Sequence, residues 1–228
     1  MHPALLLLTD SRLPAGGHAH SGGTERAIVS GAVHDVPSLA SFLRGRLHTA
    51  GAVTAALTAA ACAEAAQNAT PAGWTALDAE VDARTAAPAQ RDASRTQGRL
   101  LLRVARRVWP SPVLHELARA TPSPHHPIAL GAAAHAAGAT PEEAALAAAY
   151  HAVSGPATAA VRLLGLDPVA VHALLAGLSS DLTAVAAQSC LALTTPGPRW
   201  ETLPAYSAPA LDLLAEQHAQ AEVRLFVS

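Results

Sequence analysis

The sequence contains no lysine, and all 15 of its basic residues are arginines. A chain without lysine cannot form a Walker A phosphate-binding loop, which requires that side chain, or a Schiff base with a carbonyl substrate. Any nucleotide chemistry in which this protein takes part must therefore be carried out by a partner.

Aromatic residues are also scarce, with three Trp, two Tyr and two Phe in 228 residues, although half of the chain is hydrophobic. Alanine and leucine dominate instead, and alanine has the highest helix propensity and lets helices approach closely. The composition predicts an all-α protein, a single-domain bundle of about eight to ten helices over residues 1–228.

Neither the charge nor the cysteines indicate that the protein binds nucleic acid or a membrane, or that it is secreted. A formal net charge of −2 gives no field that would attract nucleic acid or an anionic membrane. Cys62 and Cys190 lie in apolar stretches and lack CxxC spacing, which favours buried free thiols in a reducing cytoplasm. The apolar start ends at Asp10 without a preceding basic region, so no signal peptide is expected, and no apolar run reaches the ~18 residues of a membrane span.

Apolar residues at spacings of three and four predict the helices, and prolines and caps mark where they start. The sequence Thr140-Pro141 followed by two acids is a clear start signal. In the helix that follows, Tyr150 falls on the apolar stripe and is expected in the core, whereas Arg162 is expected at the surface. The predicted helices lie at about 24–30, 37–67, 72–85, 90–109, 111–120, 127–137, 141–164, 168–194 and 209–222.

A polar loop at residues 9–23 carries the first candidate chemistry, since it holds His18, His20 and Ser21 among four glycines. A serine nucleophile is disfavoured because the loop lacks the first glycine of a nucleophile elbow and its strand–turn–helix setting. The two histidines, joined by His125 or His126, could form a metal site, so a metal-binding hydrolase is the alternative function. The remaining interpretation is a structural loop with tight glycine turns.

Arginines form the second candidate site, since Arg95, Arg99, Arg103 and Arg106 recur at helical spacing with Arg107 beside them. The pattern is typical of a solvated face, and it also fits a docking face for an acidic partner. A nucleic-acid regulator is a third hypothesis, disfavoured by the net charge and by the absence of interleaved aromatic residues.

The end of the sequence is unusually apolar, with Leu225, Phe226 and Val227 where chain ends are normally polar. Such a tail either packs on its own domain or binds a partner, and we favour the partner.

Several motifs together resemble one family. Residues 7–25, LLTDSRLPAGGHAHSGGTE, resemble the N-terminal signature of the UreF family of urease accessory proteins, and His218 with residues 224–228 resembles its closing motif, H-x-x-x-x-x-R-L-[FY]-x-S. Weaker matches lie at residues 94–99, 126–131 and 160–163. The chain is therefore identified as a member of this family along essentially its whole length.

The resemblance implies an all-α, cytoplasmic homodimer with no catalytic activity and no cofactor or bound metal of its own. It implies binding to UreD (also called UreH), recruitment of the GTPase UreG and delivery of nickel to apo-urease. The tail would bind UreD/UreH, and a surface with Tyr150 and Arg162 would recruit UreG. His18 stands where the family usually has Phe or Tyr, and Arg162 where some relatives have Lys. The implied partner-binding residues are His18, His20, Glu25, Tyr150, Arg162, Arg224, Leu225, Phe226 and Ser228.

Overall fold

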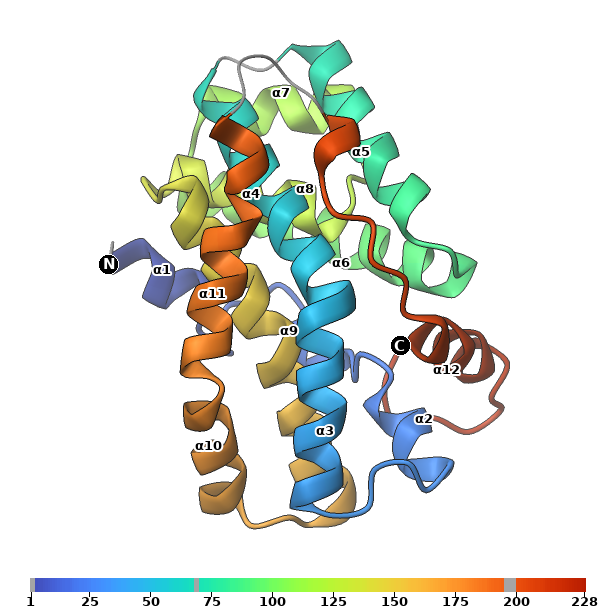
Figure 1. Cartoon of the computed structure of the whole chain (residues 1–228). Coiled ribbons are helices and arrows are strands. Elements are labelled where there is room, and N and C mark those ends of the chain that lie inside the picture. Colours follow the sequence, from blue (N-terminus) through green and yellow to red (C-terminus); the bar gives the residue numbers. More distant parts are fainter. Residues whose placement is uncertain (1–2, 68–69, 195–199) are drawn as a thin grey trace.

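The computed structural model describes residues 3–67, 70–194 and 200–228, and within these ranges every regular element is helical (Figure 1). The all-α prediction is confirmed. The α-helices are α1 (Pro3–Leu8), α2 (Thr24–Val29), α3 (Val36–Arg46), α4 (Ala52–Ala66), α5 (Pro71–Arg84), α6 (Pro88–Val108), α7 (Pro112–Ala120), α8 (His126–Ala136), α9 (Pro141–Leu164), α10 (Pro168–Gly177), α11 (Ser179–Ser189) and α12 (Pro209–Ala219). Short 3₁₀ turns occupy Gly17–Ala19, Leu191–Thr194 and Trp200–Thr202, and a π turn occupies Leu47–Gly51.

Local sequence signals start most of these helices. Thr140 accepts a hydrogen bond from the backbone N–H of Glu143, and the Glu143 side chain accepts one from the backbone N–H of Thr140, which is a complete capping box. Asp35 forms the same arrangement with Ser38 before α3. A proline in the first turn is tolerated because that turn has no helical acceptor for its N–H. The predicted helix 141–164 is therefore found with the same bounds.

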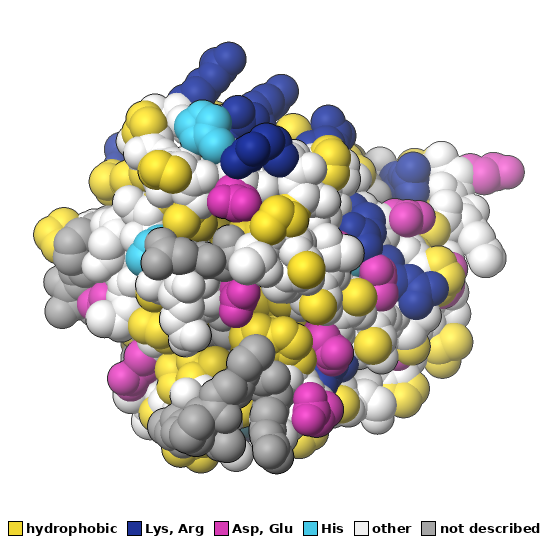
Figure 2. All heavy atoms as spheres, turned by 90° about the horizontal axis from the view of Figure 1, so that it is seen from above, with side chains coloured by type: hydrophobic (Ala, Val, Ile, Leu, Met, Phe, Trp, Pro, Cys, Tyr) yellow, Lys and Arg dark blue, Asp and Glu magenta, His cyan; other side chains and the backbone are white. Residues whose placement is uncertain are grey.

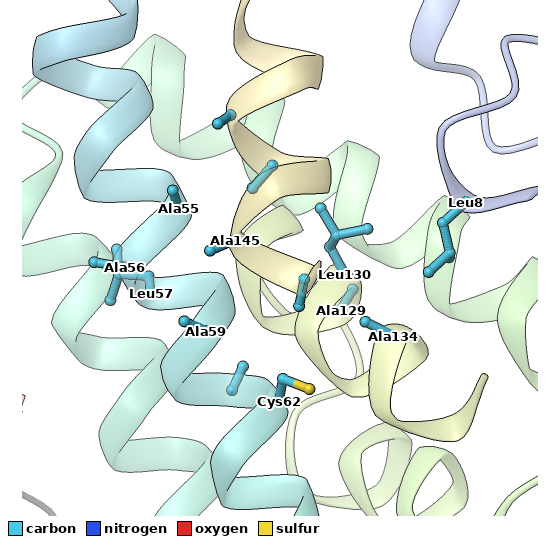
Figure 3. Close-up of a cluster of buried hydrophobic side chains, with 14 of the residues drawn as sticks. Leu8, Ala55, Ala56, Leu57, Ala59, Cys62, Ala129, Leu130, Ala134 and Ala145 are labelled. Atoms are coloured by element: carbon cyan, nitrogen blue, oxygen red, sulfur yellow. The ribbon is translucent and has the colours of Figure 1, made fainter. Parts of the chain in front are cut away.

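The core is built mainly of alanine and leucine, where α4, α8 and α9 pack against one another. Figure 3 shows Ala59 and Cys62 of α4 in this cluster with Leu130 of α8 and Ala145 of α9. Gly131 allows α8 to approach α4 closely, because a Cβ atom there would lie 2.4 Å from the Thr58 carbonyl oxygen. Small side chains therefore fix how near α8 lies to α4.

The helix predicted at 37–67 is observed as α3, the π turn and α4 in continuous sequence. By length and composition this stretch, Val36–Ala66, could cross a membrane, but 61% of its most apolar window is buried inside the protein. It therefore has the burial expected of a core helix. Cys62 and Cys190 are both free, as predicted, but only Cys62 is buried, whereas Cys190 after α11 is partly exposed.

The helix predicted at 168–194 is broken. It divides at Leu178 into α10 and α11, and the two segments are bent by 44°. Apolar residues at spacings of three and four still face inward across the break, since Leu178, Leu182 and Val185 are buried. A glycine at position 177 weakens the helix at this point, and Ser179 begins the next one.

The C-terminal part of the chain returns to the N-terminal part. Helix α12 packs against α2 and α6, and the C-terminal end lies beside α2 (Figure 1). The last eight residues, 221–228, have no helix and run back towards the loop at residues 9–23. This return brings the two most distinctive motifs of the sequence together.

Candidate functional site

The glycine-rich loop is held to the bundle by one half-buried arginine. Arg46, at the end of α3, donates from Nη1 to the carbonyl oxygen of Gly22 at 2.8 Å and from Nε to that of Ala152 in α9 at 2.9 Å. Gly22 has φ +61°, and a Cβ atom there would lie 3.1 Å from Arg46 Nη2. Burial lowers the pKa of Arg46 to about 10, so the side chain remains charged at neutral pH.

The start of the loop is ordered by an exposed ion pair. Arg12 donates from its backbone N–H and its side chain to the carboxylate of Asp10, with Nη2 2.7 Å from Oδ2. The side-chain and backbone hydrogen bonds from Arg12 lower the pKa of Asp10 to about 2. His18 lies further along the loop and is exposed.

The tail pairs with this loop through main-chain hydrogen bonds. The backbone N–H of Ser21 donates to the main-chain oxygen of Ser228 at 2.6 Å, and that of Val227 donates to the carbonyl oxygen of Ala19 at 2.8 Å. His20 adds a side-chain contact, with Nδ1 2.6 Å from the hydroxyl oxygen of Ser228. Burial, and to a lesser degree His18, lowers the pKa of His20, so the ring is neutral at physiological pH.

Glu25, in the first turn of α2, binds the tail from the other side. Its carboxylate accepts hydrogen bonds from the backbone N–H groups of Leu225 at 2.8 Å and Phe226 at 3.2 Å. Buried His218 of α12 lies beside it, with Nδ1 3.7 Å from Oε2 of Glu25 and Nε2 3.2 Å from the carbonyl oxygen of Phe226. Only 8% of Glu25 is exposed, so its carboxylate is largely shielded from solvent, whereas its hydrogen bond with the N–H of Leu225 is part-buried.

Side chains of the tail alternate between the protein and the solvent. Phe226 is 5% exposed, and the guanidinium carbon of Arg162, near the end of α9, lies 5.0 Å from its ring centroid. Its two neighbours point outward, since Leu225 is 77% and Val227 58% exposed. We call this assembly the loop–tail junction, comprising Ala19, His20, Ser21, Glu25, Arg162, His218, Phe226, Val227 and Ser228.

Of the predicted partner-binding residues, five lie in the junction itself: His20, Glu25, Arg162, Phe226 and Ser228. Leu225 is tied to it by its backbone but has an exposed side chain. His18 and Arg224 are both exposed, and no hydrogen bond or ion pair joins them in the part of the chain that is described.

Tyr150 lies apart from the junction and corrects one expectation. It was predicted to pack in the core, but it is 37% exposed, with its ring centroid 6.5 Å from that of His151. Helix α9 is buried on several sides, so a single apolar stripe does not identify its exposed positions. Arg162 is exposed, as predicted.

Two further histidines, His126 and His151, lie near the loop, and the sequence did not predict that they would lie close together. The ring centroids of His126 in α8 and His151 in α9 are 6.2 Å apart. Burial is the main cause that lowers the pKa of His126 to about 3 and that of His151 to about 4, so both are neutral. Both line a cavity of about 720 Å³, which Arg46 and Arg224 also line.

The residues that the structure describes do not assemble the metal site expected of a hydrolase. Among the described residues, one group places three ligand atoms within 4.8 Å of one another, and it consists of Asp78, Asp82 and His125 without either loop histidine. Arg95 already forms ion pairs with both carboxylates, at 2.9 and 2.6 Å. His125 donates from Nε2 to Asp82 at 2.9 Å, and burial lowers its pKa despite the nearby acids. This network joins α5 and α6 to the turn before α8.

Arg46 and His151 were missed by the sequence reasoning. Neither belongs to a motif or to a periodic stripe. Arg46 binds the carbonyl oxygen of Ala152, which is 106 positions away in the sequence, and His151 is set apart by the burial that lowers its pKa. Their roles become visible only when the loop is placed against α3 and α9.

Comparison with known proteins identifies relatives along the whole chain. The UreF family profile matches residues 33–179. The chain is 46% identical over 227 residues to the urease accessory protein UreF of Mycobacterium sp. (strain JLS), covering 98% of this chain and 97% of the relative. It is 44% identical over 225 residues to that of Mycolicibacterium vanbaalenii and 41% identical over 227 residues to that of Mycobacterium tuberculosis H37Rv, with the same coverage. All three are named as accessory proteins, in agreement with the prediction that this chain is not an enzyme.

Proposed function

This chain belongs to the UreF family of urease accessory proteins, and we propose that it is a non-catalytic scaffold for nickel delivery to apo-urease. In this proposal the whole chain acts in the cytoplasm as one domain and as a homodimer. It binds a UreD/UreH-type protein through the tail and recruits a UreG-type GTPase. Because the chain has no lysine for a phosphate-binding loop, GTP hydrolysis belongs to the partner.

One observation carries the tail assignment: the tail is fixed by its backbone while its apolar side chains face solvent. Val223, Leu225 and Val227 are 90%, 77% and 58% exposed, and the N–H groups of residues 225–227 are all bonded to the protein. A preordered apolar strip loses little conformational entropy on binding, which favours a stable complex. Leu213 on α12, 64% exposed, adds apolar surface on the helix that leads into the tail.

Arg162 connects this surface to the one proposed for UreG. It stacks on Phe226 at one end of α9, and Tyr150 lies twelve residues earlier, about 18 Å along the helix axis. We therefore assign recruitment of the GTPase to Tyr150 and its surroundings, with Arg162 contributing to both surfaces.

The test is co-expression of the tagged chain with UreD-like and UreG-like proteins, followed by size-exclusion chromatography with light scattering. The intact chain is expected to yield a complex of defined mass that contains all three proteins. Leu225→Ala removes most of an exposed side chain without disturbing the backbone hydrogen bonds. It should therefore lower the affinity for the UreD-like partner by about tenfold or more. Val169→Ala, at a position 75% exposed on α10, is the matched control and should leave the complex intact.

Two results would contradict the proposal. Undiminished UreD-like binding by Leu225→Ala and by a chain lacking residues 224–228 would remove the tail from the interface. Submicromolar nickel binding by the isolated chain, lost in a His18→Ala/His20→Ala variant, would favour the metal-binding hydrolase instead.

A further inference from the structure

Helix α6 presents a basic patch that the loop–tail junction does not use. The patch consists of Arg99, Arg103, Arg106 and Arg107, all exposed. At 100° and 1.5 Å per residue, they occupy an arc of about 100° and a length of about 12 Å. The buried side of the same helix carries Leu101, Leu102 and Ala105. Seen from above, arginine side chains gather along one edge of the molecule and project into solvent (Figure 2).

The four guanidinium groups have no acidic partner in the part of the chain that the structure describes. None of them forms a hydrogen bond or an ion pair with any residue in the described ranges. Arg95, one turn earlier on α6, is committed to the network with Asp78 and Asp82 and does not belong to the patch. Other arginines of the chain have acidic partners: Arg12 pairs with Asp10, Arg44 with Asp181 and Arg84 with Glu80.

Helix stability does not explain the patch. Like charges three or four residues apart destabilise a helix, and Arg103 has such a neighbour in each of the other three arginines. Arg106 and Arg107 lie in the last turn, where positive charge favours the helix dipole. Arg99 and Arg103 lie further from that end and gain little from it, so the stability of the helix does not explain why they stand beside Arg106 and Arg107.

We propose that the basic patch docks a carboxylate-rich protein surface. Arginine forks bind carboxylates in a bidentate manner, and four forks within two helical turns match a cluster of acids. The formal net charge of the chain is −2, so the rest of the molecule is acidic and would repel the extended phosphate backbone of a nucleic acid. Among the large exposed hydrophobic residues of α6 there is Val108 but no aromatic residue on which bases could stack.

The proposed interaction is electrostatic and therefore depends strongly on salt. With no apolar centre in the patch, binding should be fast and weak. The patch should speed the association of the partner and set its orientation, and it should add little to the lifetime of the complex. It is separate from the scaffold function proposed above, because the patch residues make no contact with the loop–tail junction among the described contacts.

The test uses a fluorescein-labelled octaglutamate peptide and fluorescence anisotropy with the full chain. The intact protein should bind the peptide at about 50 mM salt and release it at about 500 mM, where the Debye length falls to a few ångströms. The double variant R99Q/R103Q should bind about tenfold more weakly, since each exposed pair contributes a few-fold. The control R12Q/R44Q removes the same charge from exposed positions elsewhere and should stay within about twofold of the intact protein.

Three results would overturn the inference. They are an equal loss in both double variants, no peptide binding at low salt, and tighter binding of an oligothymidylate than of the peptide, which would identify a nucleic-acid surface. Thermal unfolding confirms that R99Q/R103Q is folded, and its Tm should match or exceed that of the intact chain because repulsion is relieved. Leu225→Ala should leave peptide binding unchanged, so failure of either proposal is recognised separately.

Discussion

Replacing Glu25 by alanine should release the tail from the loop without unfolding the bundle. The carboxylate accepts two charge-assisted hydrogen bonds, from the N–H groups of Leu225 and Phe226. Hydrogen bonds to charged groups contribute roughly 1.5–3 kcal/mol each. The freed N–H of Leu225 becomes hydrated because its surroundings are exposed, so we expect a total near 3 kcal/mol, the lower end of the combined range.

A loss of about 3 kcal/mol raises the open population of the tail roughly a hundredfold. Amide hydrogen exchange measures this population directly, because exchange occurs from the open state. In Glu25→Ala, the N–H groups of Val227 and Ser21 should exchange about a hundredfold faster although neither bonds to Glu25, since the tail opens as a unit. Amides in α4 and α8 should keep their protection.

Two further variants make the measurement specific. Glu25→Gln keeps one acceptor oxygen and should accelerate exchange to an intermediate degree. Glu222→Ala removes an exposed acid from the same segment and should have no effect. Unchanged exchange at Val227 and Ser21 in Glu25→Ala would refute the reasoning, because the tail would then be held by contacts other than this carboxylate.

Other predictions concern the core and its buried groups. Gly131→Ala should destabilise the protein by about 2 kcal/mol or more in chemical denaturation, because the new Cβ would meet α4 backbone at 2.4 Å. Gly45→Ala is the control, since it has open space around it and should stabilise α3 by about 1 kcal/mol. The pKa values of His126 and His151 are lowered, so in the unfolded chain these two side chains take up protons below a pKa of about 6.5 while in the native state they do not. Together they should lower the free energy of unfolding by about 3 kcal/mol from pH 7.5 to 5.5, and a His126→Asn/His151→Asn variant should lose that contribution. Burial raises the pKa of Cys62 to about 12, so this thiol should not react with a disulfide reagent at pH 8 until the protein is unfolded.

The helices were largely predictable because their signals are local. A proline and a cap place the start of α9, and apolar spacing identifies the inward face of α11. The π turn at Leu47–Gly51 and the break at Leu178 were missed. Apolar residues at spacings of three and four continue across both features, so the spacing encodes neither of them, although Gly177 weakens the helix at the second.

The loop–tail junction was only partly predictable. Family resemblance selected His20, Glu25, Phe226 and Ser228, but nothing local indicates that a carboxylate at position 25 binds amides two hundred residues away. We favoured the interpretation that the tail binds a partner rather than its own domain. In the structure the side chain of Phe226 packs on the protein, while Leu225 and Val227 face solvent. Alternation of this kind requires an extended backbone with partners on one side, which depends on the placement of α2 and α12.

The way in which Glu25 and Ala19 hold the tail has an evolutionary consequence. Every bond that they make with residues 225–227 is to backbone N–H groups, which are the same for any amino acid except proline. The residues at positions 225 and 227 can therefore mutate without loosening the attachment. This separates two selective pressures along one short segment, since anchoring constrains the main chain and Phe226 while the outward positions remain free to co-vary with whichever surface they meet.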